Sequence, residues 1–429
     1  MNQTLLWIPH AWIPWPLLWV WLAVVVVVFI AMGSRRGWTT ALWEVGPTSA
    51  VVAAIIIWGL PFLETPDINP DDPLGPLVVR GLAIRGYGVF LAAGILSAIG
   101  LVIWRARRSG GSVETLLSLC FWIIVGGILA ARLFYVLQKW NEFSIRQPLD
   151  FVAAMADMTR GGLVVYGSFL GALAVTIFFV RRRNLALWPT LDILAPGMTL
   201  GLCIGRLGCL MNGCCFGGPC DPEFFAGIQF PPGSPPYMRQ LERGTLLGFS
   251  GTWRAHEALP LHVEKVEEGS VADRLGIQPG DAVGMLSFNE LLLHAIAEGR
   301  VSGEFAVNWP TQSQGVPRPL VVSTSDLPTR GLPIHPTQIY ASITALLLTV
   351  LLWTAFDHRR FPGQVFCLLL ILYGVGRYLE ESIREDEPGW LGTPFTISQW
   401  LSMLGVLVGF TLWCWLSRTQ PKPDAPGAA

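Results

Sequence analysis

The run LLWVWLAVVVVVFIAMG, residues 17–33, decides the fold class, because it is apolar along its whole length and carries no charged side chain. A helix crosses a bilayer core with about 20 mostly apolar residues. A second run of this kind, LLLTVLLW at residues 346–353, lies in the last quarter of the chain. Of the 429 residues, 52% are apolar and only 14% are charged, which excludes an ordinary soluble surface. We therefore predict an all-α polytopic membrane protein.

Nine segments of the chain are candidates for membrane spans, and the second is the shortest and weakest. They cover approximately residues 15–33, 48–63, 87–104, 115–137, 163–180, 190–209, 339–356, 363–380 and 396–416. Arginines follow every odd-numbered segment, as in Arg181–Arg183. Because basic clusters mark the cytoplasmic side, we predict nine spans with the N-terminus outside and the C-terminus in the cytoplasm. The segment 210–337 then lies outside.

Two polar strings border apolar runs, GRLGCLMNGCCFGG at residues 205–218 and HPTQIY at residues 335–340. A lone arginine near a helix end often extends toward the lipid headgroups and has no other role. Ionisable residues at membrane depth otherwise mark functional sites. Two clustered strings with several glycines favour the functional interpretation.

The predicted topology brings polar groups from separate spans to one side of the membrane. They are Arg85, Tyr87, Arg132, Tyr135, Tyr166, Arg206, Asn212, His335, Gln338, Tyr340, Arg377, Glu381, Arg384 and Gln399. Arginine suits phosphate, because its planar fork donates two parallel hydrogen bonds and keeps its charge. We therefore predict a pocket for a phospholipid headgroup. Glu381 follows Arg377 by one helical turn and either pairs with the arginines or accepts a proton.

Five motifs resemble those of one family. GRLGCLMNGCCFG is similar to GRxGNFxNxExxG, the signature of the prolipoprotein diacylglyceryl transferase family. HPTQIY resembles the HPSQLYE motif of that family, and YGVGRYLEESIRE resembles its YGxxRxxxExxRE stretch. IRGYG at residues 84–88 resembles the first core helix, and GGLVVYGSFLG at residues 161–171 the GGxxxHGGxxG segment. The resemblance covers residues 80–417 in the family's order and implies a seven-helix core preceded by an N-terminal hairpin.

The resemblance implies a reaction at the bacterial cytoplasmic (inner) membrane, with the active site near the outer face. The family transfers the diacylglyceryl group of phosphatidylglycerol to the lipobox cysteine of a prolipoprotein signal peptide, with no cofactor and no metal. On this basis Arg206 holds the headgroup, Asn212 and Gly217 shape the loop, and Arg377 neutralises the departing phosphate. The other expected lipid-binding residues are Tyr87, Arg132, Gln338 and Arg384. The expected catalytic residues are His335, Arg377, Glu381, Tyr166 and Tyr340.

The chain departs from the family pattern at chemically important positions. Tyr166 replaces the histidine of GGxxxHGG, Cys209 replaces asparagine, and Cys214 replaces glutamate. The substrate thiol must become a thiolate to attack, and tyrosine, with a pKa of about 10, is a poor base at neutral pH. Histidine titrates near neutral pH, so we favour His335 as the base, with Glu381 as the alternative.

A β-rich insertion interrupts the transferase pattern. LHVEKVEEGSVADRLGIQPGDAVGMLSFN, within residues 261–325, resembles a PDZ domain, a family that binds carboxyl-terminal peptides by adding a strand to a sheet edge. We predict six parts: an N-terminal transmembrane hairpin with an acidic loop, the first part of the core, an irregular linker, the PDZ-like domain, the second part of the core and a cytoplasmic tail. Their boundaries are 1–79, 80–220, 221–260, 261–325, 326–417 and 418–429.

Cys209, Cys214, Cys215 and Cys220 form a cluster outside the membrane. Their spacing is a poor match to the C-x₂₋₄-C pairs of structural zinc sites, and an oxidising compartment favours disulfides. Three interpretations of these cysteines stay open: disulfides that cross-link the loop, free cysteines that act as small residues, and metal or redox chemistry.

Two classes of function remain at this stage. One is the lipid-modifying transferase, and the other is a non-catalytic membrane adaptor that presents the PDZ-like module. The formal net charge of −1 makes nucleic acid an unsuitable partner, because a basic face is its usual footprint.

Overall fold

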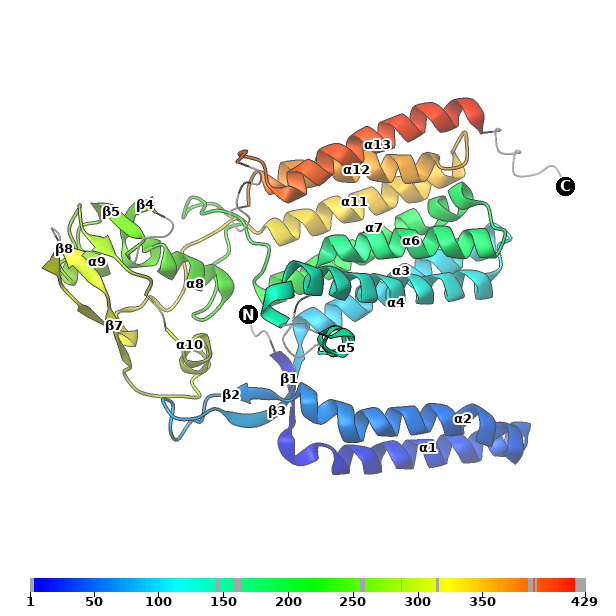
Figure 1. Ribbon diagram of the computed structural model, residues 1–429, viewed down its shortest axis with the longest axis horizontal. Helices are drawn as coiled ribbons and strands as arrows, with labels where there is room; N and C mark the ends of the chain where they lie inside the picture. Colours follow the sequence, from blue (N-terminus) through cyan, green and yellow to red (C-terminus); the bar gives the residue numbers. More distant parts are fainter. Residues whose placement is uncertain are drawn as a thin grey trace. The chain divides into compact units, whose positions relative to one another are not determined.

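The computed structural model describes residues 4–143, 147–157, 162, 164–254, 259–286, 288–313, 316–384, 389 and 392–420 (Figure 1). The chain forms two compact units. The mixed unit comprises Met1–Gly88, Cys209–Gln338 and Arg384–Asp386, and the helical unit comprises Val89–Gly208, Ile339–Ile383 and Glu387–Ala429.

A long helix covers each of the nine predicted segments. These helices are α1 (Trp15–Arg36), α2 (Trp38–Ala54), α3 (Gly86–Arg108), α4 (Val113–Gln138), α6 (Val165–Arg182), α7 (Leu187–Asn212), α11 (Thr337–Asp357), α12 (Gln364–Glu381) and α13 (Ile397–Thr419). Helix α2 begins at Trp38 rather than near residue 48, and it continues into a π-helical turn, Ile55–Gly59, and a 3₁₀ turn, Leu60–Leu63. Leucine-, valine- and alanine-rich sequences without interior charges favour such helices in a bilayer, where every backbone group needs an internal partner.

Six of the helices in the described part of the chain are long and apolar enough to cross a membrane, namely α1, α3, α4, α7, α11 and α13. The chain is therefore a multi-pass membrane protein. The count of nine spans stays a prediction, because α2, α6 and α12 do not meet that criterion over the described residues.

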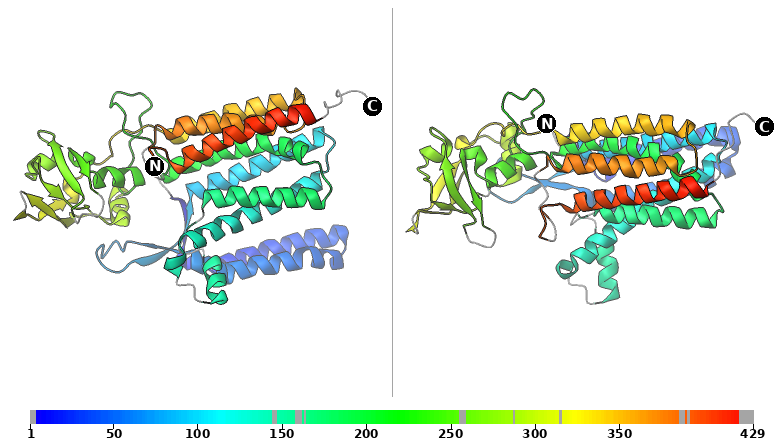
Figure 2. Two further views of the ribbon diagram at one scale, coloured as in Figure 1. Left: turned by 45° about the horizontal axis from the view of Figure 1, so that its top comes forward. Right: turned by 90° about the horizontal axis from the view of Figure 1, so that it is seen from above.

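The long helices of the helical unit run side by side (Figure 2), and glycines let some of them pack closely. A Cβ added at Gly94 of α3 would lie 2.8 Å from the carbonyl oxygen of Gly201 in α7. A Cβ at Gly167 of α6 would lie 2.7 Å from the carbonyl oxygen of Ala130 in α4. Backbone contact through glycine is a common means of helix association in lipid, and here it fixes the helices that carry the expected site residues.

The mixed unit contains a three-stranded sheet that we did not predict. Its antiparallel strands are β1 (Thr4–Pro9), β2 (Thr65–Asp67) and β3 (Val78–Arg85), in the order β1-β3-β2. The all-α expectation is wrong for these segments. These strands are short apolar or β-branched runs that flank α1, α2 and α3. From the sequence pattern alone, such a run cannot be distinguished from the end of a membrane-spanning helix.

The β-rich insertion is larger than its predicted limits. Strands β4 (Phe249–Trp253), β5 (Leu261–Val266), β6 (Ala282–Val283), β8 (Thr311–Ser313) and β9 (Val316–Pro317) form one sheet, and β7 (Ala306–Trp309) pairs with β10 (Leu320–Ser323). Helices α8 (Pro235–Glu242), α9 (Val271–Arg274) and α10 (Glu290–Ala297) accompany them. Tyr237 of α8 and Phe249 of β4 belong to the same hydrophobic core as Leu261 and Trp309. The irregular structure expected for residues 221–260 is therefore wrong for α8 and β4, whose apolar side chains are interspersed with prolines and glycines.

Helix α10 packs against the segment that follows β2. Ile68 shares a small core with Leu292, Ala295 and Val301. The neighbouring Asp67 is 4% exposed, and its Oδ2 lies 2.9 Å from Nη1 of Arg80 and 2.9 Å from Nη1 of Arg300. The buried carboxylate of Asp67 thus links the three-stranded sheet to Arg300, which lies just after α10.

We expect Asp67→Ala to loosen α10, because two arginines lose their common partner and breaking a buried ion pair is costly. Backbone amides of α10 should exchange with deuterium about tenfold faster or more. The matched control is Asp71→Ala, since Asp71 is exposed beside the same strand. Equal exchange in the two variants would contradict the assigned role of Asp67.

Candidate functional site

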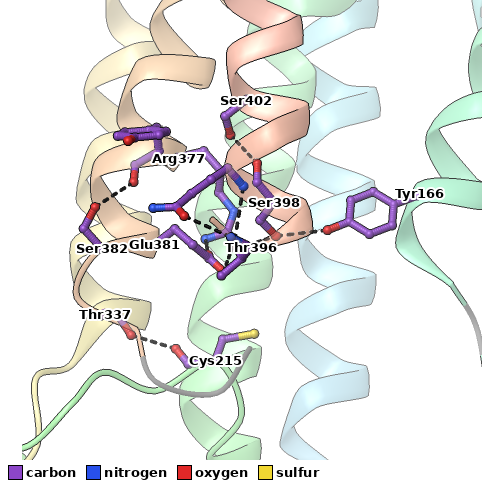
Figure 3. A network of polar contacts seen from close by, with 11 residues as sticks. Tyr166, Cys215, Thr337, Arg377, Glu381, Ser382, Thr396, Ser398 and Ser402 are labelled. Atoms are coloured by element: carbon purple, nitrogen blue, oxygen red, sulfur yellow. Dashed lines mark hydrogen bonds and ion pairs between the residues drawn. The ribbon is translucent and has the colours of Figure 1, made fainter. Parts of the chain in front are cut away.

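A buried ion pair occupies the end of α12 in the helical unit (Figure 3). Nη1 of Arg377 lies 2.5 Å from Oε2 of Glu381, one helical turn along. The Glu381 side chain is fully buried and the Arg377 side chain is 11% exposed. Thr396 donates a hydrogen bond of 3.1 Å from Oγ1 to Oε1 of Glu381. Glu381 therefore holds the guanidinium of Arg377 in a fixed direction.

Ser398 links this pair to Tyr166 (Figure 3). Nη2 of Arg377 donates to Oγ of Ser398 at 3.1 Å, and that oxygen is 3.0 Å from the Tyr166 hydroxyl. The Ser402 hydroxyl in turn donates to the Ser398 carbonyl at 2.7 Å. Tyr166 thus occupies a hydrogen-bonding position, and the network joins α6, α12 and α13.

Ser398 and Thr396 are not among the residues that we singled out from the sequence. Thr396 is the N-cap of α13, and it forms a capping box with Gln399. The pattern of threonine followed three residues later by glutamine is a readable helix-start signal. That signal predicts where α13 begins, but it does not predict that the same threonine binds Glu381.

Arg132 has a different position from the one expected for a lipid-binding residue. It is fully buried in α4, and Nη2 donates to the carbonyl of Ala154 at 2.8 Å. Further donors reach the carbonyls of Asp157 and Gly162. Ala154 belongs to the short helix α5 (Pro148–Ala156), which the sequence did not predict. The geometry favours a role in holding the segment before Tyr166 rather than a contact with phosphate.

The signature loop of the mixed unit pairs with the segment before α11. The amide of Gly217 donates to the His335 carbonyl at 3.1 Å, and the His335 amide donates to the Gly218 carbonyl at 3.0 Å. Gly217 also forms an antiparallel bridge with Arg384. The ring of His335 lies 5.2 Å from that of Phe224. Within the mixed unit, the structure therefore brings Gly217 and Gly218, His335 and Arg384 together.

Two buried side chains of α11 hold the cysteine pair of this loop. Thr337 donates from Oγ1 to the Cys215 carbonyl at 2.7 Å (Figure 3). Gln338, which is fully buried, donates from Nε2 to the Cys214 carbonyl at 2.8 Å. Gln338 thus positions the loop, whereas the sequence suggested a lipid contact.

The remaining expected residues lie at helix ends. Arg206 is half-buried in the last two turns of α7, and Asn212 is its final residue. Tyr340 is half-buried in the first turn of α11, and Tyr87 is 40% exposed at the start of α3. A Cβ at Gly86 would be 3.1 Å from Cβ of Met211, so the IRGYG segment contacts the end of α7.

We expect Gly217→Ala to disrupt this loop. A Cβ there would lie 2.7 Å from the His335 carbonyl oxygen and 2.8 Å from its Cβ, so backbone must move. The activity expected from the family resemblance should fall at least about tenfold, since small displacements of positioned groups are costly. Gly100→Ala is the control, because a Cβ at Gly100 meets no atom within 4 Å. Normal activity of Gly217→Ala would show that the loop tolerates movement.

The structure carries all eight cysteines as free thiols. The sulfurs of Cys209, Cys214 and Cys215 lie within 4.8 Å of one another. Cys220 is outside that group, and burial together with the neighbouring Asp221 raises the pKa of its thiol. The disulfides considered from the sequence are thus not formed in the structure, and three of the four clustered thiols converge.

These features define a class of protein: a polytopic membrane protein whose helix ends carry a buried arginine–glutamate pair and a glycine-dependent polar loop. Residues 76–415 match the family described as prolipoprotein diacylglyceryl transferase. The chain belongs to this family.

Relatives support the assignment along the chain. It is 32% identical to the phosphatidylglycerol–prolipoprotein diacylglyceryl transferase of Rhodopirellula baltica, over 100% of this chain and 92% of that protein. It is 26% identical to the protein of the same name from Gloeobacter violaceus, over 82% of this chain and 96% of that protein. A third relative of this name, from Synechococcus elongatus, is 36% identical over 34% of this chain and 50% of its own length.

Proposed function

We propose that the chain is a phosphatidylglycerol–prolipoprotein diacylglyceryl transferase. It transfers the diacylglyceryl group of phosphatidylglycerol to the lipobox cysteine thiol of prolipoproteins, an early step of bacterial lipoprotein maturation. The names of its relatives support this activity. The observation that carries it is the buried Arg377–Glu381 pair, which is hydrogen-bonded through Ser398 to Tyr166 at the positions of two family motifs.

The arginines act on the phosphate at two stages. Arg206 is proposed to bind the phosphatidylglycerol headgroup, with Asn212 and Gly217 shaping the loop, and Tyr87, Tyr340 and Arg384 are proposed as further lipid-binding residues. Arg377 stabilises the charge that develops as the phosphate leaves, and Glu381 orients its fork. Fixed charges aimed at a developing charge are often the largest catalytic contribution.

His335 is the proposed acceptor of the thiol proton, because Glu381 is engaged by Arg377 and Thr396. His335→Gln should lower transfer about 10²-fold at neutral pH, the low end of the usual contribution of a positioned base. The loss should shrink as pH rises, because the substrate thiol then ionises unaided. An unchanged rate across mildly acidic to alkaline pH would remove His335 from the mechanism.

The proposed setting is the bacterial inner membrane, with nine spans, the N-terminus outside and the site near the outer face. The arginines in the last turns of α1, α3 and α6 support this orientation. Alkaline phosphatase fused after Arg300 should be active, whereas the same fusion after Arg183 should be silent.

The insertion is proposed to bind peptides as PDZ domains do. Strand β4 lies at one edge of the five-stranded sheet and is largely exposed after Phe249. An extended carboxyl-terminal peptide can add to such an edge. Peptides with a free carboxyl terminus should bind the full chain more tightly than their amidated forms.

The decisive experiment is complementation. The full chain is expressed in a bacterium depleted of its own transferase, and lipoprotein processing is followed. Recovery supports the transferase, and purified protein should then move labelled diacylglyceryl from phosphatidylglycerol to a lipobox peptide. A correctly inserted chain that restores nothing would favour the non-catalytic adaptor.

A further inference from the structure

The three converging thiols of Cys209, Cys214 and Cys215 come from two backbone segments. Cys209 lies in the last turn of α7, and the chain reverses after Asn212 through Gly213, whose φ is +73°. Cys215 also has a positive φ, +58°, a conformation that side-chain-bearing residues rarely adopt. These turns direct Cys214 and Cys215 back toward Cys209.

Each thiol of the triad interacts with both others. Cys209 contacts the side chains of Cys214 and Cys215, and Cys214 also contacts those of Cys215 and Asn212. Zinc binds thiolates at about 2.3 Å, which places sulfurs of a tetrahedral site about 3.8 Å apart. The sulfurs here lie within 4.8 Å of one another, so small side-chain rotations suffice to hold one ion.

Two side chains of α11 fix the loop that carries the thiols of Cys214 and Cys215. Thr337 and Gln338, both buried, donate to the carbonyls of Cys215 and Cys214. The Oε1 atom of Gln338 is buried and has no hydrogen-bond partner among the described residues. These hydrogen bonds fix the backbone that carries the thiols of Cys214 and Cys215.

We propose that Cys209, Cys214 and Cys215 form a zinc site with an open fourth position, and that the lipobox thiol of the prolipoprotein binds there. The second part of this proposal rests on the transferase function. Within the described residues, the group contains three ligands and no fourth histidine, cysteine or carboxylate. Three protein ligands with an open position are characteristic of catalytic rather than structural zinc.

The departures from the family pattern fit this assignment. Cys209 and Cys214 stand where the family has asparagine and glutamate, and Tyr166 stands where it has histidine. Zinc deprotonates a coordinating thiol, so a metal site supplies the activation that a missing histidine base no longer provides.

The transfer step is balanced without an oxidant or reductant. The lipobox thiol binds zinc as a thiolate, and its proton passes to His335 and then to solvent. The sulfur electron pair attacks the glyceryl carbon that bears the phosphate, so a C–S bond forms. The C–O bond to the phosphate breaks, and glycerol phosphate leaves with that electron pair.

A disulfide explains the triad less well. One bridge uses two sulfurs and leaves the third thiol beside it without a role. The mutual contacts of all three sulfurs instead match a shared ion.

Metal content tests the site independently of turnover. Full-length protein purified without chelators should contain about one zinc ion per chain. Cys214→Ser and Cys215→Ser should each lose most of it, whereas Cys220→Ser, the control at the external cysteine outside the triad, should keep it. Zinc absent from the parent protein, with a disulfide between two triad cysteines found by mass spectrometry, would overturn the site. Zinc retained in both triad variants would identify an adventitious ion only.

Cobalt substitution tests the fourth position. Co²⁺-loaded protein should show thiolate-to-metal charge-transfer absorption and the intense visible bands of tetrahedral cobalt. A lipobox peptide with cysteine should change this spectrum, and the same peptide with serine should not. Equal responses to the two peptides would overturn thiol binding. A cysteine-specific response in protein that performs no transfer would support the site while rejecting the transferase function.

Discussion

Arg377→Lys should lower the rate of diacylglyceryl transfer by about 10²- to 10³-fold, the effect of removing one charge-stabilising donor from an active site. Arg377 uses two nitrogens of its fork at once: Nη1 forms the ion pair with Glu381, and Nη2 donates a hydrogen bond to Ser398. Lysine keeps the charge but has a single ammonium group on a flexible stem. A lysine at position 377 therefore cannot bind Glu381 and Ser398 at once and also direct donors at the phosphate in a fixed geometry.

The loss should appear mainly in kcat, because Arg377 is proposed to act on the departing phosphate. It is measured with purified protein, labelled phosphatidylglycerol and a lipobox peptide. Arg107→Ala is the control, since Arg107 is an exposed arginine at the other end of α3 from Tyr87. Full activity of Arg377→Lys would mean that position 377 needs only a positive charge.

The sequence predicted the helical core well because its signals are long. Apolar runs of membrane length identify helices at all nine expected positions. The spacing of Arg377 and Glu381 placed both on one helical face, and pairing was one of the two roles considered for Glu381. Local periodicity is sufficient for inferences of this kind.

The sequence did not predict the features that depend on contacts between distant segments of the chain. The role of Arg132 follows from α5, a short helix whose carbonyls it reaches more than 20 residues along the chain. The strands β1 and β3 are separated by two long helices and pair only in the folded chain. The thiol triad is similar, because spacing alone argued against metal and only the turns at Gly213 and Cys215 bring the sulfurs together.

Asp192 is the most consequential residue that sequence reasoning passed over. It is fully buried in α7, and its carboxylate accepts hydrogen bonds from the amides of Gly363 at 2.8 Å and Phe366 at 3.0 Å. Nε of Arg359 lies 3.7 Å from Oδ2. The carboxylate therefore caps the first turn of α12, where free amides and the helix dipole favour a negative charge.

Asp192→Ala should destabilise the protein by about 3 kcal/mol, because it leaves two buried amides and one arginine without their acceptor. The measurement is thermal unfolding of purified protein in detergent. Asp357→Ala is the matched control: Asp357 also pairs with an arginine, Arg105, but its side chain is 59% exposed. Arg105 is itself buried, but it keeps its hydrogen bond to the Trp353 carbonyl when Asp357 is removed, so Asp357→Ala should cost less than Asp192→Ala.

Asp192→Asn separates the two contributions of this carboxylate. Asparagine retains one oxygen that can accept an amide hydrogen bond but carries no charge, so its cost should fall between those of Asp357→Ala and Asp192→Ala. Because Arg377 sits at the opposite end of α12, a loosened first turn should affect the transfer rate less than it affects stability. If Asp192→Ala unfolded at the parent temperature yet abolished transfer, the carboxylate would belong to the chemistry and not to the cap.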